Sequence, residues 1–320
     1  MKTIDKTDKK IILELFRDGR MPVNKLARAI GISKEVALYR IKKLQKQEII
    51  KQFIPIIDLS PTGINMYRLQ LKFRTVSQEK LEKFNAYVKQ IPQLSWMVNL
   101  QGQWDIVLLF WIKSVQEFKN IYDDIVHKFG SMFEEKLFTI VTSIEHYPPT
   151  YIIKAERKPL VTQCLEPGQI FCMDKNQLRI LAELYGDARK PLQEIAKNLN
   201  VSISTVIYHM KILRQKKIIV GFRPVLGIDQ LGYEHFKVTI QLNDPSQKKI
   251  FKEKLAINNN ITYITESIGK YDLEFEAEYN KVNELLDFLE NVKKDIGIKN
   301  FEIIFRNEEI VINEIPGSEE

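Results

Sequence analysis

The stretch LARAIGISKEVALYRIKKL at residues 26–44 decides the fold of this 320-residue chain, because a second version of it, IAKNLNVSISTVIYHMKIL, occupies residues 195–213. In each copy a short apolar helical pattern ends at a turn, and a serine then precedes a second helical pattern. Ser33 and Ser202 are the predicted N-caps, since a serine hydroxyl accepts a free N–H of the first helical turn. The sequence therefore predicts two helices joined by a tight turn, twice in one chain.

The repeat extends over nearly the whole chain, which reads as one unit of about 150 residues written twice. After the helical part the apolar period changes from helical to alternating, as in Tyr67–Phe73, which is typical of a strand. We expect an α+β fold in which each repeat has a winged or three-helix helix-turn-helix domain followed by a ferredoxin-like βαββαβ domain. The expected boundaries are 1–60 and 173–228 for the helix-turn-helix domains, 61–154 and 229–315 for the ferredoxin-like domains, and 155–172 for a linker.

Positive charge is concentrated in the two helical blocks. The sequence pI is about 9.1, and residues 1–60 and 167–232 have net charges of +7 and +5, whereas the rest of the chain sums to −5. The longest apolar run, 106–112, is too short to cross a bilayer, and the N-terminus does not resemble a signal peptide. Two cysteines are too few for a disulfide scaffold. We therefore expect a cytoplasmic protein, without membrane association, that binds a polyanion.

A basic helix-turn-helix suits double-stranded DNA, because the major groove admits one α-helix and flanking cations neutralise phosphates. The alternative is a small helical bundle with a solvated basic face that serves as a dimerisation module. The charge segregation favours DNA. The predicted DNA-binding residues are Ser33, Lys34, Leu38, Tyr39, Arg40, Lys42, Lys43, Ser202, Ser204, Thr205, Ile207, Tyr208, His209, Lys211 and Arg214.

These patterns resemble the Lrp/AsnC (feast/famine) transcriptional regulators. The resemblance rests on Gly31-Ile32-Ser33, on Arg40-Ile41-Lys42-Lys43-Leu44, on Glu48-Ile49-Ile50 and on a Gly-x-x-Asp turn between the second and third strands of each βαββαβ part. It implies a transcription factor whose sensing domain dimerises and binds a small effector, such as an amino acid, near that turn. This chain departs from the family in supplying both units itself.

Gly102, Asp105, Gly269 and Asp272 are the predicted effector-binding residues. The alternative is purely structural, because a hairpin turn often needs a glycine at positive φ and an aspartate can cap it. We see no cofactor-binding motif and no set of metal ligands.

The third strands of the two sensing domains differ in charge. Glu274 and Glu276 belong to an acidic row in the second copy, whereas the first copy has apolar residues there and offers Arg68, Lys72 and Arg74 on its first strand. We therefore expect the two domains to pair within the chain as an unequal pseudodimer. The apolar face that includes Val107, Leu109 and Trp111 favours further assembly into a homo-oligomer.

The same unequal pairing also resembles the siroheme decarboxylases. The candidates for proton or carboxylate chemistry are His127, His146 and His235, with Arg68 or Arg74. Their spacing forms no catalytic motif, and two basic helix-turn-helix blocks are retained. We therefore expect a regulator and not an enzyme.

Overall fold

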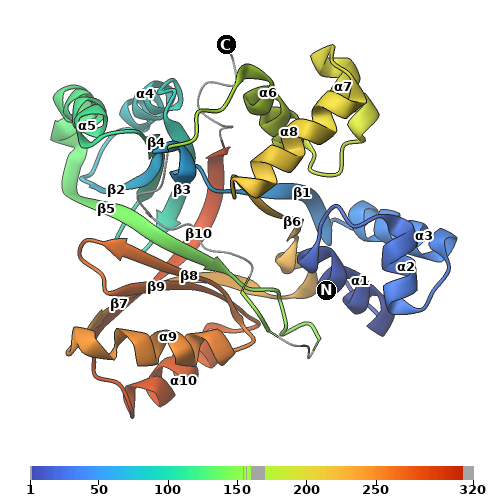
Figure 1. The fold of residues 1–320 in the computed structure, drawn as a ribbon. Helices are drawn as coiled ribbons and strands as arrows, with labels where there is room; N and C mark the ends of the chain where they lie inside the picture. Colours follow the sequence, from blue (N-terminus) through green and yellow to red (C-terminus); the bar gives the residue numbers. More distant parts are fainter. Residues whose placement is uncertain (1, 154, 156, 160–169, 313–320) are drawn as a thin grey trace.

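Two small helical heads lie beside a β-barrel in the computed structural model, which describes residues 2–153, 155, 157–159 and 170–312 (Figure 1). Residues 160–169 of the expected linker, and the end of the expected second sensing domain, lie outside the described residues. The helices of the heads are α1 (Lys6–Arg17), α2 (Val23–Ile30) and α3 (Lys34–Lys46) in the first head, and α6 (Lys175–Gly186), α7 (Leu192–Leu199) and α8 (Ile203–Gln215) in the second.

Local sequence signals explain where these helices begin and end. Asp5 and Asp174 cap α1 and α6 in capping boxes, and their side chains accept the N–H of the third helical residue. The turn before α3 uses Gly31 in the left-handed conformation at φ 76°, and the second head uses Asn200 there. The predicted three-helix pattern is therefore present in both copies.

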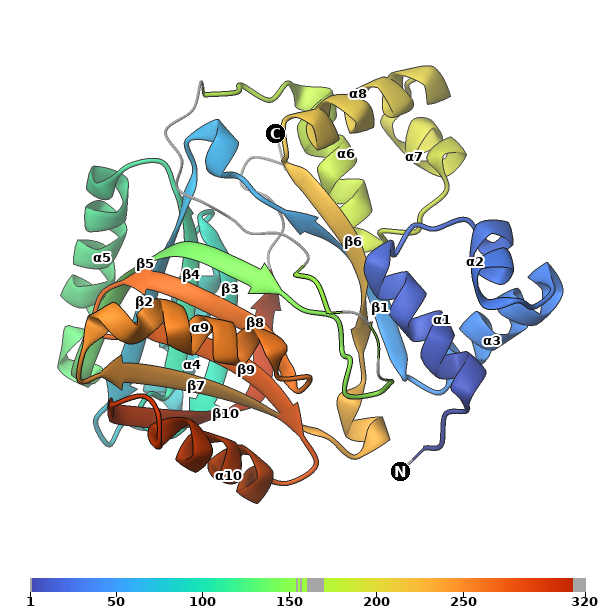
Figure 2. The same ribbon diagram turned by 60° about the horizontal axis from the view of Figure 1, so that its bottom comes forward.

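A two-stranded ribbon joins the heads, with β1 (Ile50–Ile57) antiparallel to β6 (Ile219–Leu226). The strands come from different units, and Figure 2 shows the ribbon running between the heads and the barrel. Ile54 pairs with Arg223 at its centre. The apolar side chains of both heads and of the ribbon form one continuous core.

Two arginines lock the heads to each other. Arg189 donates to the carbonyls of Gly19 and Met21 at 2.6 and 3.2 Å, and the pseudo-equivalent Arg20 donates to the carbonyls of Ala188 and Lys190. Each guanidinium therefore satisfies carbonyls of the other head, which fixes the heads as one body.

The two βαββαβ parts merge into one closed barrel, in the order β10-β3-β4-β2-β5-β8-β9-β7. The strands are β2 (Asn65–Phe73), β3 (Leu94–Gln101), β4 (Ile106–Ile112), β5 (Phe133–His146), β7 (Glu234–Leu242), β8 (Ile261–Ile268), β9 (Leu273–Tyr279) and β10 (Ile298–Ile312). Helices α4 (Gln78–Lys89), α5 (Val115–Phe129), α9 (Lys248–Ile257) and α10 (Val282–Lys293) cover its outside (Figures 1 and 2). The units meet where β5 pairs with β8 and where β10 pairs with β3.

Each strand shows one face to the helices and one to the barrel interior. On β4, Ile106, Leu108 and Phe110 pack with the helices of the first unit, whereas Val107 packs with Val98 and Ile304 in a separate cluster. The apolar face that was predicted to favour further chains is therefore partly used up, because Val107 is buried inside the barrel.

Two aromatic residues, Trp104 and Tyr271, meet between the two halves of the barrel, where the Trp104 indole N–H donates to the Tyr271 hydroxyl at 3.1 Å. Both precede the first residue of their strand, so strand alternation does not extend to them.

In the part of the chain that the structure describes, no helix has the length and apolar character needed to cross a membrane.

Candidate functional site

The helices α3 and α8 present their outer faces to solvent. The N-cap hydroxyls of Ser33 and Ser202 accept from Val36 N and Thr205 N at 3.2 and 3.0 Å. Side chains exposed on these helices are Lys34, Leu38, Tyr39, Lys42, Ser204, Ile207, Tyr208, Lys211 and Arg214, while Lys43 and Thr205 are half-buried. Most of the predicted DNA-binding residues therefore have a free path to a groove.

Arg40 and His209 are held inside their heads. Arg40 Nη1 lies 2.6 Å from Asp5 Oδ2 and 2.8 Å from Asp8 Oδ1. His209 is buried, with Nδ1 3.5 Å from Asp174 Oδ2. Each side chain turns back toward the capping box of the first helix, so neither is presented to a groove in this structure.

The Gly-x-x-Asp turns have matching structures in the two units. Gly102 and Gly269 have φ values of 138° and 157°, which favour glycine. Asp105 Oδ2 accepts from Phe73 N, and Asp272 Oδ2 from Leu242 N, both at 2.7 Å. These carboxylates tie the turn to the adjacent strand, and effector binding at Gly102, Asp105, Gly269 and Asp272 stays a prediction.

A cleft of about 280 Å³ lies between the ribbon and the barrel. Phe16 and Tyr185 of the heads line it on one side, and Trp96 and Tyr263 of the barrel on the other. Its titratable and charged side chains are His146, Tyr147, Tyr185, Arg223, His235, Tyr263, Glu276 and Glu278. The cleft thus combines aromatic walls with acidic and basic groups, which is typical of a small-molecule site.

His146 is an uncharged histidine at the end of β5. Its Nδ1 atom is buried and finds no hydrogen-bond partner among the described residues, and its ring contacts Tyr263 edge to face. Burial, with the positive charge of Arg223 nearby, lowers the pKa of His146 from 6.5 to about 3. At neutral pH this side chain carries no charge and can accept a hydrogen bond.

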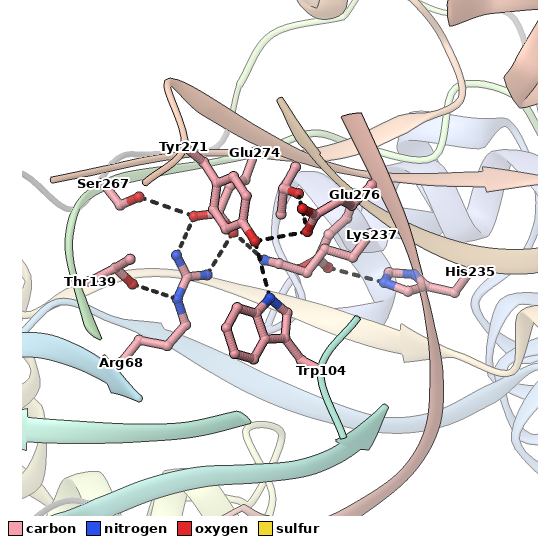
Figure 3. Close-up of polar contacts among 11 residues, drawn as sticks. Arg68, Trp104, Thr139, His235, Lys237, Ser267, Tyr271, Glu274 and Glu276 are labelled. Atoms are coloured by element: carbon pink, nitrogen blue, oxygen red, sulfur yellow. Dashed lines mark hydrogen bonds and ion pairs between the residues drawn. The ribbon is translucent and has the colours of Figure 1, made fainter. Parts of the chain in front are cut away.

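His235 is in the opposite electrostatic environment. Its Nε2 lies 3.2 Å from Glu276 Oε2 and its Nδ1 3.8 Å from Glu278 Oε1 (Figure 3 shows the Glu276 side). Tyr151 donates its hydroxyl to Glu278 and so fixes that carboxylate. A proton on this ring would therefore lie between two carboxylates.

Arg223 supplies a cation to the cleft. Its guanidinium lies 5.4 Å from the Tyr263 ring centre, and its Nε is buried with no hydrogen-bond partner in the described chain. An unpaired guanidinium N–H in a cleft suits a carboxylate of a ligand.

The structure brings together only part of the set predicted for proton or carboxylate chemistry. His146 and His235 line one cleft, but His127 is exposed on α5, Arg68 lies inside the barrel, and Arg74 is exposed and donates to the Phe133 carbonyl. Sequence reasoning missed Arg223. The available signal was that its counterpart in the repeat is the apolar Ile54.

Together, the two helix-turn-helix heads and the fused ferredoxin-like barrel define a tandem two-unit protein, and the comparisons agree with this organisation. A model of the AsnC-type helix-turn-helix domain matches residues 4–45, and a model of winged helix-turn-helix DNA-binding domains matches residues 173–220. The chain belongs to the Lrp/AsnC family of transcriptional regulators.

Named relatives match one unit of the chain. It is 30% identical over 122 residues to the transcriptional regulator AzlB of Bacillus subtilis, covering 38% of this chain and 78% of that protein. This chain is also 32% identical over 117 residues to the HTH-type transcriptional regulator Ptr1 of Methanocaldococcus jannaschii, covering 37% of this chain and 79% of that protein.

A solved structure matches both units together. The siroheme decarboxylase NirDL aligns with 97% of this chain and 94% of its own at a TM-score of 0.67 and 15% identity. The structure of its complex with an iron-uroporphyrin III analogue aligns at a TM-score of 0.65 and 14% identity. The expectation that the chain is not an enzyme is contradicted by this match, because the protein whose fold aligns with both units is named as an enzyme, whereas the regulators AzlB and Ptr1 match less than half of the chain.

Proposed function

We propose that this chain is a decarboxylase that acts, in the cleft beneath the ribbon, on an iron tetrapyrrole with several carboxylate side chains, of the siroheme type. The observation that carries the proposal is the pair His146 and His235, one neutral and one flanked by carboxylates, in a single cleft with Arg223. Paired titratable groups whose environments separate their protonation states are the mark of acid–base chemistry. The whole-length likeness to NirDL supports the same assignment.

The reaction needs a carboxylate anchor and a proton. A decarboxylation breaks the bond between the carboxyl carbon and its neighbour, releases carbon dioxide and leaves an electron pair on that neighbour, which must then be protonated. The imidazolium of His235 would donate this proton, with Glu276 orienting the ring. Arg223 would hold a carboxylate, and Trp96 and Tyr263 would contact the apolar ring edges.

His146 has a different part in this scheme. Since it stays uncharged in the cleft, it would contact the substrate by a hydrogen bond or by ring packing without drawing a carboxylate into an ion pair. A carboxylate that is to be lost is released more readily where no fixed cation stabilises it in the ground state.

The direct test is to incubate the full-length chain with siroheme and to follow the tetrapyrrole by its absorbance and by mass. We expect an absorbance change on binding and loss of carbon dioxide from the tetrapyrrole. No mass change with the folded chain, under reducing and non-reducing conditions alike, would contradict the proposal.

A second function is favoured by the exposed faces of α3 and α8. We propose that the heads bind double-stranded DNA, with Lys42 and Lys211 at phosphates and Tyr39 and Tyr208 near base edges. Tyr39 and Tyr208 are 68% and 61% exposed, which is unusual for aromatic residues that serve packing alone. Duplex binding that weakens as salt rises would support this function, and binding that ignores salt would contradict it.

A further inference from the structure

A buried carboxylate inside the barrel holds cations from both units. Glu274 is fully buried, and Arg68 contacts both of its oxygens, with Nη1 2.8 Å from Oε2. Lys237 Nζ lies 3.1 Å from the same Oε2. Although burial alone would raise its pKa, Arg68 and Lys237 lower the pKa of Glu274 to about 2. Glu274 is therefore a permanent anion between two cations.

The same lysine extends the contacts toward the cleft. Lys237 Nζ also lies 3.7 Å from Glu276 Oε1, and the other oxygen of Glu276 faces His235 at 3.2 Å. Charges thus alternate along Arg68, Glu274, Lys237 and Glu276, and the row ends at His235; we call these five residues the charge row (Figure 3). Only its last two members line the cleft.

Strand pairing does not require the charge row. The counterparts of Glu274, Glu276 and His235 in the first unit are Val107, Leu109 and Met66, on strands that pair in the same register. Buried ion pairs cost desolvation and are often replaceable by apolar residues without loss of stability. A role at the cleft explains why the carboxylates of the row lie on the second unit and not on the first.

We propose that Lys237 is a positioning residue, which shares the carboxylate of Glu276 with His235 and thereby sets how firmly the ring holds its proton. The inference rests on the proposed function, because it concerns the group that would donate the proton there. Glu276 cannot pair fully with the imidazolium while the Lys237 ammonium draws on its other oxygen. Glu274 and Arg68 keep Lys237 in place from behind.

Other charged groups also face the His235 ring. Glu278, on β9, lies beside Nδ1 and accepts a hydrogen bond from the Tyr151 hydroxyl. Arg223, on β6, and the neutral His146, at the end of β5, line the same cleft. The ammonium of Lys237 opposes retention of the proton. Its removal should therefore strengthen the interaction of Glu276 with His235 and make the ring a weaker acid.

The test follows the ring resonances of His235 against pH by NMR in the full-length chain with labelled histidines. Four histidines make assignment by single substitution practical. In Lys237→Met the titration midpoint of His235 should rise by about one unit, as expected for removing one nearby charge at an intermediate effective dielectric. Lys237→Arg, which keeps the charge, should bring it back to within a few tenths of a unit of the unsubstituted chain.

A double-substitution cycle separates the route through Glu276 from a direct effect. In a Glu276→Gln background, the additional shift caused by Lys237→Met should shrink to less than half, and persistence of the full shift would overturn the proposal. An unchanged midpoint in folded Lys237→Met would overturn it as well. Where that variant does not fold, Lys237→Gln is measured in the same way and decides on the same terms.

The NMR titration needs no substrate. A midpoint that moves as expected in a chain that removes no carbon dioxide upholds the positioning role of Lys237 and refutes the decarboxylase function. A midpoint that stays fixed in an active chain does the reverse.

Discussion

The strand pair β7–β9 of the second unit and the strand pair β2–β4 of the first have the same register and different chemistry. His235 pairs with Glu278 on the former, and Met66 pairs with Trp111 at the same place on the latter. The first set faces a polar cleft, whereas Trp111 packs against the apolar core of the heads. One backbone plan therefore supports either a chemical site or plain packing.

The difference teaches that the charges on the second unit are not a requirement of the fold. An apolar row does the same structural work in the first unit, and apolar replacements of buried ion pairs are often neutral or stabilising. In a chain that contains the same unit twice, one half can serve packing while the other carries titratable groups.

The largest expected effect comes from removing Arg68, which leaves Glu274 buried with one cation fewer. Arg68→Met should lower the free energy of unfolding by about 3 kcal/mol, as is typical of a broken buried pair. The double variant Arg68→Met/Glu274→Val, which introduces the residue type of Val107, should recover most of this loss. Denaturant titration measures both.

Arg74→Met is the matched control, because that guanidinium is exposed and donates only to a backbone carbonyl. It should cost less than about 0.5 kcal/mol. If Arg68→Met lowers the free energy of unfolding no more than Arg74→Met does, then removing a cation from the buried Glu274 carries no special penalty, and the energetic difference between the buried pair and an exposed arginine is refuted.

Next in size is the loss of the proton donor. His235→Asn should lower the rate of decarboxylation about a hundredfold, within the usual contribution of general acid catalysis. His127→Asn, the same substitution at an exposed site on α5, should leave the rate within about twofold. Equal rates for the two variants would show that His235 is not the proton donor.

The histidine in the cleft that carries no charge gives a pH signature. The folded pKa of His146 is lowered to about 3 from 6.5, so the unfolded chain binds the extra proton between these values and stability falls as pH falls below 6.5. At pH values between them, His146→Asn should flatten the pH dependence of the unfolding free energy by about 1.4 kcal/mol per pH unit. A slope equal to that of the unsubstituted chain would mean that His146 is charged in the folded state.

Much of the fold was readable from the sequence, because its signals are local or repeated. The serine caps, the left-handed turn before α3 and the strand alternation of β2 each depend on neighbouring residues, and the repeat fixed the second copy from the first. The pairing of Arg68 with Glu274 also followed from charge complementarity, whereas Lys72 binds Asp105 of its own unit.

The site was only partly readable, because it forms where distant segments meet. Nothing local indicates that β1 pairs with β6, and that pairing is what carries Arg223 to the barrel beside His146 and His235. Histidines 89 positions apart have no spacing motif, so the sequence offered His127 with equal weight. The outward positions of α3 and α8 were readable, but the inward turn of Arg40 depends on two carboxylates at the start of α1.

A smaller effect is expected at the cation of the cleft. Arg223→Met should raise KM for the carboxylated tetrapyrrole about tenfold with a lesser effect on kcat, as for loss of a charge-assisted contact made in ground and transition states alike. Arg17→Met, at an exposed position on α1, should change neither value. A drop in kcat at constant KM would indicate that Arg223 takes part in the chemical step and does not anchor the substrate.

The smallest effect compares the two heads. Because each exposed cation at a phosphate releases about one counterion, Lys42→Met and Lys211→Met should each reduce the slope of log affinity against log salt by about one unit. Lys83→Met on α4, remote from both heads, should leave the slope unchanged. If only one of the two variants changes the slope, then one head alone contacts DNA, and the heads differ in function as the two strand pairs do. If neither variant changes the slope, the basic faces of α3 and α8 do not bind double-stranded DNA, and the helix-turn-helix heads serve only to line the cleft.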